Sequence, residues 1–239
     1  MLFRSRIQKS DWLRQLLQVP IVLSEPLTLQ GMINDRLSQV NIECDIPSGY
    51  YDDNGYRNGH ISISSPHDSL KFDVRITKLA EESNPIDLHA FGTAFNNQLH
   101  TSLQWDNHAT ERMKGQINAT ADFDTSIDGR QTAHVQLAPS LLTIRNTDWH
   151  VTPCHITYYN KHLDIDNFEI RHQQQHLLVK GTASESSLDS LNIDLQDIDL
   201  DYVLALVDFD AVSFSGLATG GGSVKGLFGD FREDRKSVG

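Results

Sequence analysis

The chain has 239 residues, of which 38% are hydrophobic and 22% charged, and 32 acidic against 20 basic side chains give a formal net charge of −12. This length allows one large domain or two small ones with a hydrophobic core of ordinary size. The negative charge would repel a phosphate backbone over most of the surface, so nucleic acid is excluded as an expected partner.

The sequence has no run approaching the roughly 18 apolar residues that cross a bilayer, and its N-terminus lacks the features of a secretory signal. If the protein is exported, we therefore expect this chain to be an internal piece of a longer one. The two cysteines, Cys44 and Cys154, are too few for a disulfide framework or a zinc site. We expect buried apolar thiols, although an oxidising compartment would permit a bridge.

Residues 1–19 predict a short amphipathic helical segment. The near-helical spacing begins after Ser10 and Asp11, which are plausible N-cap residues, and stops at Pro20. The spacing is carried by Ile7, Trp12, Leu13, Leu16, Leu17 and Val19. A later run, residues 202–207, fits either a buried strand or a second short helix, and we favour the helix. We interpret residues 20–239 as a single repetitive β-rich segment.

Beyond Pro20 the apolar residues recur with a period of two, which indicates strands with one wet face. Turn-forming residues at 65–68 and 107–110 separate two such pairs and predict hairpins. The alternation shifts by one residue at Asn167 and again at 196–197, which indicates a bulge or a turn. Roughly a dozen short strands of this kind predict an all-β fold.

The sequence offers no convincing catalytic or metal-binding motif. His172 and His176 have the spacing of a helical ligand pair, but they lie between two predicted strands and favour a polar hairpin loop. Residues 52–55 indicate an Asx turn rather than a calcium loop, and the glycine-rich stretch 218–226 indicates a flexible turn between edge strands rather than a phosphate loop. We therefore expect a non-enzymatic protein with no metal and no cofactor.

The stretch from Leu141 to Gly229 resembles the TamB (translocation and assembly module) branch of the AsmA-like family, in the version typical of Bacteroidetes-type bacteria. The resemblance is carried by a succession of short amphipathic segments and closing glycines: Leu142–Ile144, Trp149–Pro153, Ile156–Tyr159, Leu163–Ile165, Phe168–Ile170, Val179–Gly181, Leu191–Leu195, Ile198–Val203, Gly216 and Gly226–Gly229.

This resemblance implies a periplasmic protein that is anchored in the inner membrane and reaches toward the outer membrane. Its body would be an elongated, curled antiparallel sheet, a β-taco or solenoid-like groove, and its role outer-membrane biogenesis through phospholipid transport, outer-membrane protein assembly or both. Expected partners are phospholipid acyl chains and an outer-membrane assembly protein, with membrane contact through parts missing here. Because this stretch departs from the full family pattern by lacking the membrane anchor and the C-terminal domain, we expect it to be one internal section of such a protein.

In a curled sheet every second side chain faces inward, so alternate apolar residues could line a slot for acyl chains. The same residues could instead close on one another as the core of a β-sandwich, and alternation does not separate the two. The predicted groove-lining residues are Leu70, Phe72, Val74, Ile76, Met113, Ile117, Phe123, Val135, Leu163, Ile165, Leu191 and Ile193.

Two other classes of function stay open. A glycan-binding or adhesin β-sandwich would use exposed coplanar aromatic side chains as a stacking surface. The candidates for that surface are Trp105, Trp149, Tyr50, Tyr51, Tyr158 and Tyr159. A polysaccharide-acting enzyme on a β-solenoid would need a cleft with converging carboxylates of perturbed pKa.

Overall fold

The computed structural model describes residues 1–8, 20–52, 54–66, 68–80, 84–125, 127, 129–199 and 216–229. In these ranges strands predominate, with one 3-10 turn, η1 (Asp35–Leu37), and no α-helix, so the all-β prediction is confirmed. The strands are β1 (Leu2–Ile7), β2 (Ile21–Leu23), β3 (Leu27–Asn34), β4 (Gln39–Tyr51), β5 (Asn54–Ser64), β6 (Leu70–Lys78), β7 (Ile86–Phe95), β8 (Gln98–Asp106), β9 (Met113–Thr125), β10 (Gln131–Leu137), β11 (Ser140–Ile144), β12 (Thr147–Val151), β13 (Cys154–Tyr159), β14 (His162–His172), β15 (Gln175–Ala183), β16 (Ser190–Asp199) and β17 (Leu217–Lys225).

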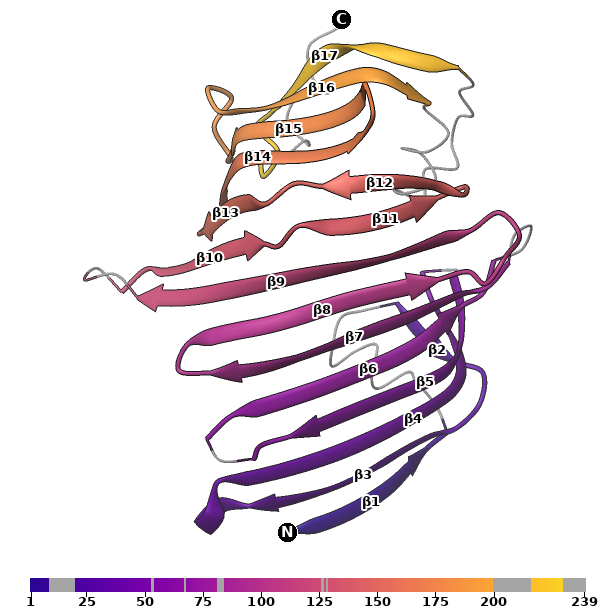
Figure 1. Ribbon diagram of the computed structural model, residues 1–239. Coiled ribbons are helices and arrows are strands. Elements are labelled where there is room, and N and C mark those ends of the chain that lie inside the picture. The colour runs from indigo at the N-terminus through magenta and orange to yellow at the C-terminus, as the bar shows by residue number, and fades with distance from the viewer. Residues whose placement is uncertain are drawn as a thin grey trace, which may run out of the picture. The chain divides into compact units, whose positions relative to one another are not determined.

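Hydrogen bonding between strands assigns these 17 strands to one antiparallel sheet, not to the two facing sheets of the alternative sandwich (Figure 1). Several strands are longer than the sequence suggested, and β4 and β9 each have 13 residues. The chain divides into two compact units, residues 1–118 and 119–239. The boundary falls within β9.

In residues 1–118 the strands pair mainly with their neighbours in the sequence. β1 pairs with β3, the strands from β3 to β8 follow as successive antiparallel pairs, and β2 pairs with the end of β4. Asn96 and Asn97 both adopt positive φ in the turn between β7 and β8, a conformation that tight hairpins require and asparagine tolerates. The predicted hairpins β5–β6 and β8–β9 are confirmed.

In residues 119–239 the end of β9 pairs with β10, and β10 pairs with β13. Strands β13 to β17 then follow as successive antiparallel pairs. β11 and β12 form a hairpin of their own, and the end of β12 pairs with β14. The apolar side chains that are less than a tenth exposed in this unit are Ala121, Leu142, Ile144, Trp149, Val151, Cys154, Ile170, Ala183, Leu191 and Ile198.

Both predicted phase shifts are β-bulges. The pairing of β14 with β15 slips by one residue between Ile165 and Phe168, and the pairing of β16 with β17 slips between Leu195 and Ile198. In each case one strand carries one residue more than its partner, which reverses the faces of the residues that follow. Asp197, inside the second bulge, has a φ of +49°.

Two predictions need correction. Residues 2–7, placed in the N-terminal helical segment, form strand β1 because they pair along their length with β3. Most of the residues with helical spacing lie at 12–19. Residues 9–19, like the run 202–207, lie outside the described ranges.

The glycines at 220–222 are not in a turn. They lie within β17 opposite Leu195, Asp194 and Ile193, and an edge strand tolerates glycine because few side-chain contacts are lost there.

Candidate apolar binding surface

One surface of the sheet in residues 1–118 is apolar because the register places alternate residues of successive strands side by side. Cys44 lies opposite Ile61, and Ile61 lies opposite Val74. Val74 is opposite Ala90, which is opposite Leu103. We call this surface the apolar face, formed by Ile42, Cys44, Ile61, Ile63, Leu70, Phe72, Val74, Ile76, Leu88, Ala90, Leu103 and Trp105.

Most side chains of the apolar face are only half-buried. Leu70 is 43% exposed and Leu103 is 44% exposed. Among the apolar side chains described in residues 1–118, only Leu27 is less than a tenth exposed. A face closed by a second packed layer would be buried almost completely, because protein interiors pack at crystal density. The apolar face is therefore not fully covered, and it is most open at Leu70 and Leu103.

Polar and charged groups occupy the opposite side of the same strands. His60 lies between two carboxylates of β4, with Nδ1 2.8 Å from Asp45 Oδ1 and Nε2 3.2 Å from Glu43 Oε2. His89 Nε2 lies 2.8 Å from Asp73 Oδ2 on β6. Because side chains alternate along each strand, these charges point away from the apolar face.

The structure brings the predicted groove residues together in two sets. Leu70, Phe72, Val74 and Ile76 share the apolar face. In residues 119–239, Val135 lies opposite Ile156, and Ile156 lies opposite Ile165. This register places the predicted groove residues of this unit on one side of their strands. These residues are Phe123, Val135, Leu163, Ile165, Leu191 and Ile193. Met113 and Ile117 occupy alternate positions of β9 and are half-buried.

The second unit differs from the first in having a closed core. Leu142, Trp149 and Val151, from the β11–β12 hairpin, are each only 2% exposed. The predicted groove residues of this unit span a wide range, from Leu191 at 8% exposed to Phe123 at 46%. The open apolar surface is therefore clearest in residues 1–118.

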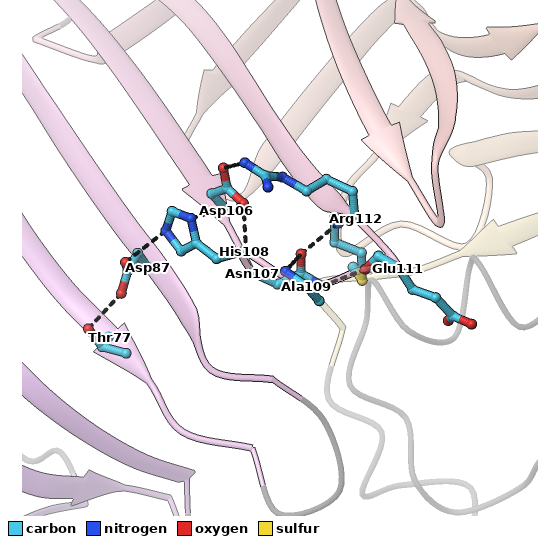
Figure 2. A network of polar contacts seen from close by, with 9 residues as sticks. Thr77, Asp87, Asp106, Asn107, His108, Ala109, Glu111 and Arg112 are labelled. Atoms are coloured by element: carbon cyan, nitrogen blue, oxygen red, sulfur yellow. Dashed lines mark hydrogen bonds and ion pairs between the residues drawn. The ribbon is translucent and has the colours of Figure 1, made fainter.

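The β8–β9 loop carries a network of polar contacts (Figure 2). Arg112 Nη2 donates to Asp106 Oδ2 at 2.6 Å, and the backbone N–H of His108 donates to Asp106 Oδ1 at 2.8 Å. His108 Nε2 lies 3.0 Å from Asp87 Oδ2, and Thr77 Oγ1 donates to the other oxygen of Asp87 at 2.7 Å. The network joins the loop to β6 and β7 and holds it in place.

Asp106 has the most heavily partnered carboxylate in this network. Burial raises its pKa, but the hydrogen bonds from His108 and Arg112, together with their charges, outweigh that effect and hold the pKa below the ordinary value. A lowered pKa makes Asp106 a poor general acid or base near neutral pH. The hydroxyl of Thr77 is bonded to Asp87 and not to His108, so the network does not have the nucleophile–base pairing of a catalytic triad.

The other motifs have local explanations. His172 and His176 flank the β14–β15 turn and face different partners, the backbone oxygen of Asp148 and the carboxylate of Asp194, so the hairpin interpretation is confirmed. Cys44 and Cys154 are free thiols. Within the described ranges, no group of side chains is suited to a metal ion, and no helix has the length and hydropathy to cross a membrane.

Four of the six aromatic side chains named as a glycan-stacking surface are not arranged as one coplanar set. Trp149 is buried at 2% exposure. Tyr50 and Tyr51 are about half-exposed, but they are consecutive in β4, and consecutive strand residues point to opposite faces. Tyr159 is covered on one side by His162, stacked at 4.5 Å between ring centroids, and carries the Arg130 guanidinium 4.7 Å from its ring centre.

No protein-family model, curated protein or solved structure matches the chain.

Sequence reasoning missed several members of the apolar face. Ile61 and Ile63 lie in the strand before the predicted turn at 65–68 but are not among the predicted groove residues, and neither are Leu88 and Ala90. Their alternation within 61–63 and 88–90 is a usable signal, but it shows only that each strand has an apolar side. The cross-strand register decides whether the apolar sides of neighbouring strands share one face, and a single sequence does not determine that register.

Proposed function

We propose that this chain is a non-enzymatic section of a TamB/AsmA-like envelope protein, and that its apolar face holds the acyl chains of phospholipids that move between membranes. The section would act in the periplasm as part of a longer, inner-membrane-anchored protein. The observation that carries the proposal is the continuous apolar face on residues 42–105, whose side chains are partly exposed.

Two features of this face, together with the energetics of apolar burial, support an acyl ligand. Rows of small and branched side chains run across successive strands, and the ionisable partners His60 and His89 lie on the other side of the sheet. Each methylene that leaves water for such a surface contributes about 0.8 kcal/mol, so a shallow surface is enough for reversible binding. A contiguous apolar patch on a protein surface is often an interaction site.

The test is native mass spectrometry of the gently purified full chain, followed by organic extraction of what co-purifies. The proposal predicts bound phospholipid. In the variant Leu70→Asp/Leu103→Asp, two carboxylates enter the apolar face at positions that are already 43% and 44% exposed, and phospholipid should be lost without loss of the fold.

The matched control is His100→Asp/Gln104→Asp, which adds two carboxylates to the opposite face of β8. It should retain phospholipid like the wild type. Circular dichroism checks that both variants keep their strand content. Lipid-free wild-type protein, or equal loss of lipid in both variants, would contradict the proposal.

A further inference from the structure

Three connections of the second unit lie side by side at one end of its strands. Thr125 and Gln131 close the β9–β10 loop, and the pairing of β10 with β13 places the β13–β14 turn next to it. Leu163 lies opposite Ala183, so the β15–β16 loop follows beyond that turn. We call the described residues of these connections the rim, which comprises 125, 127, 129–131, 158–162 and 183–189.

Each outer loop of the rim presents one aliphatic side chain to solvent. Ile127 in the β9–β10 loop is fully exposed, and Leu188 in the β15–β16 loop is 91% exposed. Four strand spacings separate these loops, which puts them about 20 Å apart. Both loops join strands that have a partner strand on each side, so neither lies on an edge of the sheet.

Hydrogen bonds hold the β15–β16 loop in the conformation that exposes Leu188. Ser184 Oγ donates to Asp189 Oδ2 at 2.7 Å and accepts from the backbone N–H of Ser186 at 2.8 Å. Ser186 Oγ accepts from the backbone N–H of Leu188 at 3.1 Å. The base of the loop is buried at Ser184, whereas its tip is not. A leucine that is fixed in water gains free energy when a partner removes it from water.

The described rim residues carry no net charge, although the chain as a whole is acidic. Arg130 and Lys161 balance Glu185 and Asp189. Glu185 Oε1 lies 2.5 Å from Lys161 Nζ, and Asp189 is bonded within its own loop. The Arg130 guanidinium lies 4.7 Å from the ring centre of Tyr159. Neutral charge removes the repulsion that the acidic parts of the chain would meet at a phospholipid surface.

The order of side chains along the rim matches the layers of a bilayer. Aliphatic groups stand at the two tips, and aromatic and basic groups, among them the half-exposed Tyr158, lie on the strands and the turn between them. Tyrosine and basic side chains favour the level of the lipid headgroups, and aliphatic side chains favour hydrocarbon. Two apolar tips about 20 Å apart suit a continuous apolar phase better than a single pocket of a protein partner.

We infer that the rim is a membrane-contact surface. Ile127 and Leu188 insert into the outer hydrocarbon of a phospholipid bilayer, and Tyr158, Arg130 and Lys161 stay at the level of the headgroups. Because the contact depends on apolar burial, it is reversible and does not require anionic lipid. It is a separate site from the apolar face of residues 42–105 and does not depend on a ligand there.

The test is flotation of the full chain with vesicles of phosphatidylcholine and phosphatidylethanolamine in equal parts. The protein should float with these neutral vesicles, and high salt should change the bound fraction by less than about twofold. Ile127→Ser/Leu188→Ser should lower the partition coefficient by about tenfold or more. The fold should be unaffected, because neither side chain is buried, and circular dichroism checks this.

The matched control is Leu37→Ser/Leu141→Ser, which removes two aliphatic side chains outside the rim that are 63% and 50% exposed. It should change the partition coefficient by less than about threefold. The variant Leu70→Asp/Leu103→Asp should float like the wild type, so that loss of lipid from the apolar face and loss of membrane contact are separate results. If this variant failed to float, the membrane contact would lie on the apolar face and the inference would be wrong.

A second measurement reads the depth of one rim residue. In a Cys44→Ser background, Leu188→Cys is labelled with an environment-sensitive fluorophore, and the buried Cys154 stays unlabelled. With vesicles the emission should shift to the blue and be quenched by lipids with brominated acyl chains, whereas the same label at Leu141→Cys should respond to neither. A wild type that does not float, equal losses in the two serine variants, or equal responses of the two labels would each overturn the inference.

Discussion

The ring of Phe72 lies against the backbone of Gly92. The two residues are opposite each other on β6 and β7, and a Cβ added to Gly92 would come within 2.7 Å of Phe72 Cε1 and would also collide with the backbone oxygen of His100. The same arrangement occurs at Gly31, where an added Cβ would lie 2.7 Å from Phe3 Cζ. At these two positions glycine makes room for an aromatic ring on the neighbouring strand.

Gly92→Ala should therefore destabilise the first unit by about 1–3 kcal/mol, because the new methyl group overpacks against Phe72 and backbone. Denaturant unfolding followed by circular dichroism measures the loss. Gly222→Ala is the control, since nothing lies within 4 Å of its added Cβ, and its effect should stay within about 1 kcal/mol of zero. Equal losses would mean that the contact with Phe72 is not what requires glycine.

Deleting Asn167 should be more damaging than replacing it. The bulge between Ile165 and Phe168 supplies the extra residue that turns Ile170, 9% exposed, into the core. Without this residue, either the residues after it turn to the opposite face of the sheet or the strand shifts its register. We expect the deletion to lower the free energy of unfolding by about 2–5 kcal/mol.

The substitution Asn167→Ser keeps the residue count and should cost less than about 1 kcal/mol. Thermal and denaturant unfolding of the two variants gives the comparison. A deletion variant as stable as Asn167→Ser would show that the bulge does not set the orientation of Ile170.

The stability contributed by Asp106 should depend on pH. Its pKa is lowered in the folded chain, so the contribution is present above the unfolded value of about 3.9 and is lost as the pH falls through the lower, folded value. Asp106→Asn removes the charge but keeps an oxygen that can accept from His108. It should reduce the free energy of unfolding by up to about 1 kcal/mol at pH 7.

The measurement is the difference in unfolding free energy between wild type and Asp106→Asn from pH 7 downward. The difference should shrink below about pH 4. A constant difference across this range would mean that the carboxylate charge is not what stabilises the loop, and that the hydrogen bond to His108 is sufficient.

Cys44 should react slowly with thiol reagents. Burial, and secondly the charge of Asp45, raise the pKa of its thiol, which lowers the thiolate fraction at pH 8. We expect Asp45→Asn to speed the reaction by about twofold to threefold at low ionic strength, and less in high salt. The chromogenic disulfide assay measures both rates, and Cys154, which is 1% exposed, should not interfere in the folded chain. If Asp45→Asn left the rate unchanged, the charge of Asp45 would not contribute to the raised pKa of the Cys44 thiol.

The sequence was most informative where local pattern determines structure. The alternation around Leu70 and Phe72, the turn residues at 107–110 and the phase shift at Asn167 correctly predicted strands, hairpins and a bulge, because each depends on residues close in sequence. Strand β1 was missed because six residues with Arg at two positions have little local signal, and pairing with β3 decides their conformation.

The candidate site was harder to read than the fold. Whether Val74 or Leu103 is covered depends on the packing of distant strands, and alternation is the same for an open face and a closed core. The difference between Leu103, 44% exposed, and Val151, 2% exposed, appears only in three dimensions.

The most direct test of the central claim uses Trp105, which lies on the apolar face opposite Leu88. In the variant Trp12→Phe/Trp149→Phe, Trp105 is the single tryptophan, and its fluorescence is measured with phosphatidylethanolamine carrying brominated acyl chains and with the unbrominated lipid. A lipid-holding apolar face predicts quenching by the brominated lipid alone, reduced in the Leu70→Asp/Leu103→Asp background. Unquenched Trp105 fluorescence with both lipids would contradict it.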